Sequence, residues 1–206
     1  MTDDRFAPFE TMIDEGRALA ILQAAVNGAD DGELFLERRR SEALSFDDGR
    51  LRNASYDASE GFGLRAVRGE VSGYAHATEI SESAITRAAE TARLAVGDGG
   101  GVMAPAPQGT NRHLYAELDP MSDAPFPAKV ELLRAIDACA RVLDPRGVQV
   151  SATVAASLQE VVILRHEGGV MTDIRPMARM NVSVIVEENG RRESGGTGGG
   201  GRPGRA

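Results

Sequence analysis

The sequence predicts an α+β protein made of two units, each a helix followed by an antiparallel meander of strands. Between residues 33 and 77, apolar and polar residues alternate with the period of two expected for a half-buried strand. Turn signals interrupt this alternation at Gly49 and Gly69, and they return about 120 positions later at Gly169 and Gly190. The repeated order of helix, strand and turn predicts an imperfect internal duplication.

The first unit is predicted for residues 1–97. Its meander predicts a sheet of about four strands. One helix is expected before the meander in the sequence and another after it. The second helix has Ser81 as a candidate N-cap, and Gly97 is expected to end it. The apolar stripe of the first helix is Ala18, Leu22, Ala25 and Val26, and that of the second is Ile85, Ala88, Ala92 and Val96.

The second half repeats this plan after a break. Residues 98–127 are rich in glycine and proline and predict a linker, and residues 128–192 predict the second α+β unit. The helix of that unit is expected to bury Leu132, Ile136, Cys139 and Leu143. Residues 193–206 form a glycine-rich arm, which is either a flexible tail or backbone that lies close to another element. We predict the tail.

Composition and charge exclude several classes of function. With 42% hydrophobic and 26% charged residues, the chain has the composition of an ordinary globular protein. Its net charge of −8 disfavours nucleic acid as a partner, and Arg38-Arg39-Arg40, the only basic run, predicts a solvated strand edge. The acidic N-terminus is not followed by an apolar segment, so we expect no signal peptide. We also expect no membrane-spanning helix, because no apolar run is long enough. A cytoplasmic location follows, and the single cysteine agrees with it.

Motifs for catalysis or cofactor binding are not found in this sequence. Zinc requires three or four ligands that meet at one point, whereas His76, His113 and His166 are widely spaced. Each is predicted to be a surface or half-buried polar residue, and Cys139 is predicted to be a buried core thiol. The G-x-S-x-G elbow of serine hydrolases and the glycine fingerprints of nucleotide-binding loops are missing. We therefore assign no catalytic, cofactor-binding or metal-binding residue and expect no cofactor in this chain.

Two segments have a more specific pattern. One runs from Leu44 to Leu51 and continues through Gly61-Phe62-Gly63-Leu64-Arg65 to Ala75. The other joins Arg175-Pro176, the valine-rich run to Val186, Glu187-Glu188-Asn189-Gly190 and the glycine arm. These segments resemble the TldD/PmbA family of zinc metallopeptidases, and the order of the second is similar to the TldD-like side of the family.

The resemblance implies several properties. Family members are cytoplasmic, cleave partly unfolded peptides or propeptides and pair a TldD-like with a PmbA-like subunit. Their zinc is held by a HExxxH helix and a later cysteine, all beyond the glycine arm. We expect this chain to stop before that helix, through truncation or a frameshift, and to be inactive alone. The alternative is a stand-alone module that binds extended peptides by strand addition.

Overall fold

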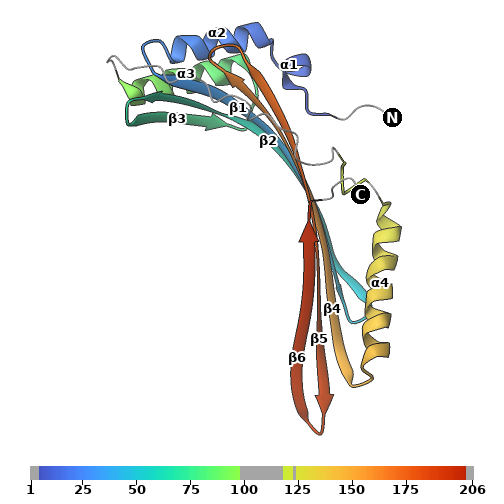
Figure 1. The fold of residues 1–206 in the computed structure, drawn as a ribbon. Helices are drawn as coiled ribbons and strands as arrows, with labels where there is room; N and C mark the ends of the chain where they lie inside the picture. The colour runs from blue at the N-terminus through green and yellow to red at the C-terminus, as the bar shows by residue number, and fades with distance from the viewer. Residues whose placement is uncertain (1–4, 98–117, 123, 203–206) are drawn as a thin grey trace. The chain divides into compact units, whose positions relative to one another are not determined.

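The computed structural model describes residues 5–97, 118–122 and 124–202. Its strands form one six-stranded sheet in the order β3-β2-β1-β4-β5-β6 (Figure 1). The elements are α1 Pro8–Thr11, α2 Glu15–Ala25, β1 Asp31–Asp47, β2 Arg50–Arg68, β3 Val71–Ala77, α3 Glu82–Val96, α4 Phe126–Leu143, β4 Gly147–Arg165, β5 Val170–Glu188 and β6 Arg191–Gly201. The predicted α+β class is confirmed.

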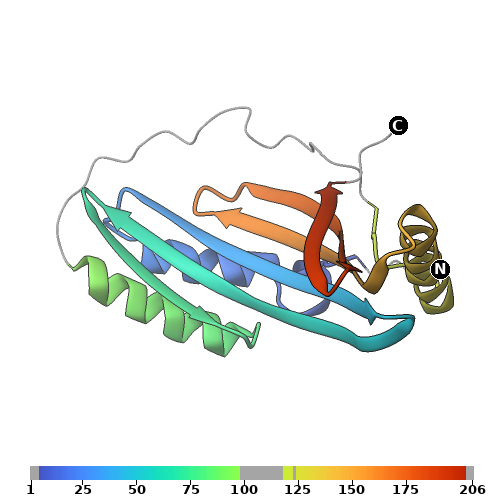
Figure 2. The same cartoon turned by 90° about the horizontal axis from the view of Figure 1, so that it is seen from below.

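Each meander has three strands, and a helix precedes each one. Figure 2 shows β1, β2 and β3 side by side, and both β2 with β3 and β5 with β6 pair antiparallel. The first meander therefore has three strands and not about four, because residues 50–68 form one continuous strand, β2. Its polar residues remain in the strand because β2 borders β1, a strand of similar length, in the sheet.

The two meanders meet along β1 and β4. The backbone N–H of Asp48 donates to Val150 O at 2.8 Å, and that of His166 donates to Gly32 O at 3.2 Å. As β1 advances along the sequence, its partner residues on β4 recede, so this pair is also antiparallel. The sheet order therefore reads third, second, first, first, second, third strand across the two meanders, as a duplication would produce. The duplication itself stays a prediction.

The turns follow the predicted signals. Asp48 and Gly49 both have positive φ, as do Asn189 and Gly190, so each pair forms the type of two-residue turn that suits the twist of a hairpin. Consecutive left-handed residues are unfavourable for most side chains. Asparagine, aspartate and glycine are the residues that tolerate this conformation best.

Two compact units share these strands. The first consists of Met1–Arg39, Ser59–His113 and Glu160–Asp173, and the second of Arg40–Ala58, Leu114–Gln159 and Ile174–Ala206. Both units interleave distant parts of the chain, whereas the boundaries predicted from the sequence are consecutive. Those boundaries describe stretches of sequence and stay a prediction.

In the first unit, α2 and α3 cover the sheet (Figure 1). Asp14 caps α2 by accepting from the backbone N–H of Arg17 at 2.9 Å, and Ser81 caps α3 by accepting from Ala84 N at 3.2 Å. Gly97, with a φ of 67°, follows the last turn of α3. Both predicted apolar stripes are buried, together with Leu34, Leu36, Leu64 and Leu164 of the strands.

In the second unit, α4 packs on one face of the strands, but not with the predicted residues. Its buried positions are Lys129, Leu133 and Asp137. Leu133 contacts a core of Leu44, Phe46 and Ala152. The predictions of a buried Leu132, Cys139 and Leu143 are wrong, since all three are exposed. The helix is apolar on two sides, so its spacing alone does not identify the inner side.

Candidate functional site

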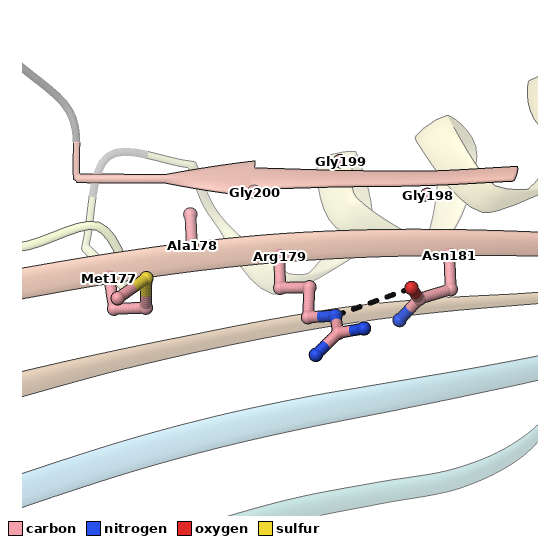
Figure 3. Close-up of a pocket in the computed structure, with 7 residues that line it drawn as sticks. All are labelled: Met177, Ala178, Arg179, Asn181, Gly198, Gly199 and Gly200. Atoms are coloured by element: carbon pink, nitrogen blue, oxygen red, sulfur yellow. Dashed lines mark hydrogen bonds between the residues drawn. The ribbon is translucent and has the colours of Figure 1, made fainter.

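A hollow on β5 and β6 is the candidate site. It encloses about 580 Å³ and is lined by Met177, Ala178, Arg179, Asn181 and Gly198 to Gly200 (Figure 3). On β5, Met177, Arg179 and Asn181 alternate along one side of the strand, whereas Ala178 points to the other side. The hollow is therefore a groove along two strands, open to solvent.

The hollow exists because β6 has no side chains where β5 has long ones. In the strand register, Arg179 faces Gly200 and Asn181 faces Gly198. Arg179 Nε donates to Asn181 Oδ1 at 3.3 Å, and Asn181 Nδ2 donates to Thr153 Oγ1 at 3.4 Å. These contacts connect the polar side chains of Arg179, Asn181 and Thr153 in a row beside the glycines of β6.

Three alternate glycines of β6 leave little room for a side chain. A Cβ at Gly198 would lie 2.4 Å from Asn181 Oδ1, and one at Gly200 would lie 2.8 Å from the backbone oxygen Ala178 O. A Cβ at Gly196 would be 3.1 Å from Val182 O, whereas one at Gly199 would meet nothing within 4 Å. A side chain is thus unfavourable at these three positions, most of all at Gly200, whereas space is available at Gly199.

This alternation leads to a prediction for the pair Gly200→Ala and Gly199→Ala. The Gly200 variant should loosen the end of β6, because its new methyl group meets a backbone oxygen that cannot rotate away. We expect amide exchange at Arg179 and Gly200 to become about tenfold faster. The Gly199 variant should leave exchange unchanged or slow it, because alanine restricts the unfolded chain. Equal rates in both variants would contradict the steric argument.

The prediction of a flexible glycine arm over residues 193–206 is wrong for residues 193–201. They belong to β6, and each residue from Arg191 to Gly201 lies opposite a residue of β5. Backbone pairing with β5 offsets the entropy that glycine loses on ordering, a contribution that composition does not reveal. Exposed ion pairs lie near the turn, with Arg192 Nε 2.6 Å from Glu187 Oε2.

β6 is also an edge of the sheet. It is the last strand in the order, and in the described part of the chain it borders only β5. An edge strand presents unpaired backbone N–H and C=O groups, to which an extended peptide can add as a further strand. Because Ser194 and Thr197 carry the only side chains of β6 from Ser194 to Gly201, little obstructs a peptide along that part of the strand.

A polar cluster lies on the same side of β4 as Thr153. Asp47 Oδ1 accepts from Gln149 Nε2 at 2.9 Å and from Ser151 Oγ at 2.7 Å. The hydrogen bond from Gln149 is the main cause that lowers the pKa of Asp47, and the bond from Ser151 adds to it. Asp47 is therefore ionised at neutral pH, and it lies 3.6 Å from Arg52 Nε.

The residues considered for metal chemistry lie apart. His166 is buried, with Nδ1 at 3.3 Å from Gly32 O and 3.5 Å from Asp31 Oδ1. The ring of His76 stacks on Tyr74 in β3, and Cys139 is exposed on α4. His113 lies outside the described residues. Within the described ranges, no group of three or more His, Cys, Asp or Glu side chains could hold a metal ion.

Sequence reasoning did not identify the hollow. Its signal was nonetheless present, because Gly196, Gly198 and Gly200 alternate after a strand rich in valine. Alternating glycines indicate a strand whose one side must lie close to other atoms.

None of the helices in the described part of the chain is long and apolar enough to cross a membrane.

Comparison with protein families gives two consecutive matches. Residues 32–96 match PmbA/TldA metallopeptidase domain 1, and residues 119–203 match the PmbA/TldA metallopeptidase central domain. The chain is 34% identical over 176 residues to the metalloprotease TldD homologue of Haemophilus influenzae. This match covers 84% of this chain and 36% of that protein. A TldD homologue of Buchnera aphidicola subsp. Schizaphis graminum is also 34% identical, over 174 residues, with the same coverage.

Solved structures share the fold. TldE from Thermococcus kodakarensis matches with a TM-score of 0.70 and 15% identity, covering 91% of this chain and 43% of that one. A candidate modulator of DNA gyrase from Bacteroides thetaiotaomicron matches with a TM-score of 0.68 and 16% identity, covering 91% and 44%. This chain therefore spans little more than a third of the length of the curated relatives that it matches.

Proposed function

Because the chain belongs to the PmbA/TldD metallopeptidase family, we propose that it is the N-terminal, non-catalytic portion of a TldD-like zinc metallopeptidase that acts on partly unfolded peptides or propeptides. In this role it scaffolds a zinc domain, contacts a PmbA-like or TldD-like subunit and forms one wall of the path taken by the peptide. The consecutive matches to domain 1 and the central domain support this assignment.

The observation that carries the proposal is the bare edge of β6. Every residue of β6 is exposed, and eight of its eleven residues are glycine, serine or threonine. Backbone hydrogen bonds recognise a peptide without regard to its side chains, which suits an enzyme for unfolded substrates. The hollow beside Arg179 and Asn181 offers room for side chains of such a peptide.

The described residues do not fit the zinc ion of the proposed full-length enzyme. Zinc needs three or four nitrogen, sulfur or oxygen ligands at one point, and the described part of the chain has no such group. We therefore derive no hydrolytic step from these residues. Zinc, the hydrolytic base and the partner subunit belong to the proposal for the longer protein, and the cytoplasmic location stays a prediction.

The purified chain should neither retain zinc nor hydrolyse peptides, because its described residues provide no ligand group. The measurement is elemental analysis after dialysis, together with a fluorogenic peptide assay with and without added zinc. Stoichiometric zinc with turnover that chelation abolishes would contradict this prediction. His76, His113 and His166 would then be the first residues to mutate.

Peptide binding is the positive test of the same proposal. A fluorescein-labelled unfolded peptide should bind saturably in anisotropy titrations. The same peptide N-methylated at alternate residues should bind at least about tenfold more weakly, since it lacks the donors needed along one edge. Gly200→Ala should weaken binding and Gly199→Ala should not. Equal binding of the plain and methylated peptides would exclude strand addition.

A stand-alone peptide-binding module is the second candidate, and the open edge of β6 supports it equally well. The two candidates differ in what the gene encodes after Ala206. Genomic sequence in all three frames, read for a His-Glu-x-x-x-His helix, distinguishes them. Finding that helix supports the metallopeptidase portion, and unrelated sequence in all frames supports the module.

A further inference from the structure

Arg179 brings a positive charge into the hollow beside β6. Its side chain is exposed and lines the hollow. Its Nε donates to Asn181 Oδ1 at 3.3 Å, a long hydrogen bond that Figure 3 shows, and within the described ranges no carboxylate forms an ion pair with its guanidinium. A guanidinium has five N–H donors in a planar fork, so most of this fork is available to a ligand.

The strands around the hollow are locally positive, although the whole chain has a net charge of −8. Residues 174–186 and 194–202, which border the hollow, contain no acidic residue and three arginines: Arg175, Arg179 and Arg202. The nearest acidic residues along β5, Asp173 and Glu187, are six and eight positions from Arg179. That is roughly 20 and 26 Å of strand, at least about twice the Debye length at physiological ionic strength. The hollow therefore suits an anionic ligand.

Asp47, in the polar cluster beside Thr153, is held by other partners. Its Oδ1 accepts from Gln149 Nε2 and Ser151 Oγ, and its Oδ2 lies 3.6 Å from Arg52 Nε. This carboxylate is therefore not a competitor for a ligand of Arg179.

The glycines of β6 leave a path from Arg179 across that strand. Arg179 faces Gly200 in the register, and a Cβ at Gly200 would lie 3.3 Å from Arg179 Cβ. A side chain at Gly200 would thus stand directly against the arginine. Neighbouring strands lie about 4.8 Å apart, so a peptide added to β6 would be roughly 10 Å from β5. Extended arginine and glutamate side chains together bridge this distance, because glycine places nothing between them.

We propose that Arg179 recognises a carboxylate group of the peptide that adds to β6, so that the site prefers acidic segments of extended polypeptide. This preference rests on the strand addition proposed above and names the chemical group that the hollow accepts. A carboxylate matches the guanidinium fork, which can donate two parallel hydrogen bonds to its two oxygens. Aspartate and glutamate side chains and the C-terminus of a peptide all supply this group.

The preference should be modest and sensitive to salt. Ion pairs at exposed positions contribute little, so we expect about three- to fivefold tighter binding of a peptide with the carboxylate. At about 1 M salt the Debye length is roughly 3 Å, and the preference should disappear.

The test is a cycle between peptide and protein variants, measured by anisotropy with the whole chain and fluorescein-labelled extended peptides. Two peptides differ only in a central glutamate or glutamine, and both have an amidated C-terminus. A third has the glutamine and a free C-terminal carboxylate. The glutamate amide or the free acid should bind about three- to fivefold more tightly than the glutamine amide, and whichever does so identifies the source of the carboxylate. Arg179→Gln should abolish the difference and change binding of the glutamine amide less than about twofold.

Arg50→Gln is the matched control, because Arg50 is exposed at the start of β2 and its loss changes the net charge by the same amount. This variant should keep the preference, and circular dichroism confirms that both variants fold.

Equal binding of all three peptides, or a preference that survives Arg179→Gln or is lost in Arg50→Gln, would overturn the role of Arg179. Strand addition would still stand in that case if the N-methylated peptide binds more weakly. Failure of all three peptides to bind would overturn strand addition and the role of Arg179 together.

Discussion

Replacing Gly73 with alanine is expected to lower the free energy of unfolding by about 3 kcal/mol, because the change overpacks the contact between β3 and α3. Gly73 is buried and pairs with Ala66 in the sheet. A Cβ at this position would lie 2.1 Å from Ala92 O and 3.1 Å from Ala92 Cα. Both atoms belong to the backbone of α3, so the helix must shift as a whole to relieve the clash.

Urea denaturation of the wild-type chain and the Gly73→Ala variant measures this effect. Gly199→Ala is the matched control, since Gly199 is also a strand glycine and its added methyl group would meet nothing within 4 Å. The control should change stability by less than about 1 kcal/mol. A Gly73 variant as stable as the control would show that α3 can move away from β3 without cost.

Leu133→Ala should cost about 3 kcal/mol of stability, whereas Leu132→Ala should cost less than about 0.5 kcal/mol. The two leucines are neighbours on α4, but Leu133 is fully buried and Leu132 is 49% exposed. Truncation of Leu133 removes methyl groups from contact with Leu44 and Phe46 and leaves a cavity between helix and sheet.

Both variants replace leucine with alanine at adjacent positions of one helix, so their changes in free energy of unfolding can be compared directly. Urea denaturation of the wild-type chain and of both variants gives the two changes in free energy of unfolding. If Leu132→Ala were the more destabilising variant, the helix would pack with the face that the periodicity of the sequence suggested, and the orientation of α4 in the structure would be wrong.

Local chemistry predicted the local structure. The cap at Ser81 and the ending at Gly97 were correct, since a cap depends on a few neighbouring residues. The turns at Gly49 and Gly190 were also correct, because left-handed backbone restricts the residue type strongly. The buried stripes of α2 and α3 followed from a single apolar face, which leaves one choice of inner side.

Contacts between distant parts of the chain were not predictable in this way. The pairing of β1 with β4 joins residues such as Asp48 and Val150, and no turn signal records it. The sequence predicted about four strands in the first meander, whereas β2 is continuous beside its long neighbour β1. The arm resembled a tail because glycine has no preference of its own for a strand, and only its pairing with β5 orders it. The candidate hollow depends on that pairing, so it was missed for the same reason.

The interleaving of the two compact units limits how the chain can be divided. The unit that contains α2 and α3 also takes Glu160–Asp173 from the end of β4 and the start of β5. Val162 and Leu164 in that segment are part of the core beneath those helices. A polypeptide that stops at Val96 therefore lacks part of its own interior, although it contains the whole match to the first family domain. Dividing this chain between its two family matches would therefore separate residues that pack in the same core.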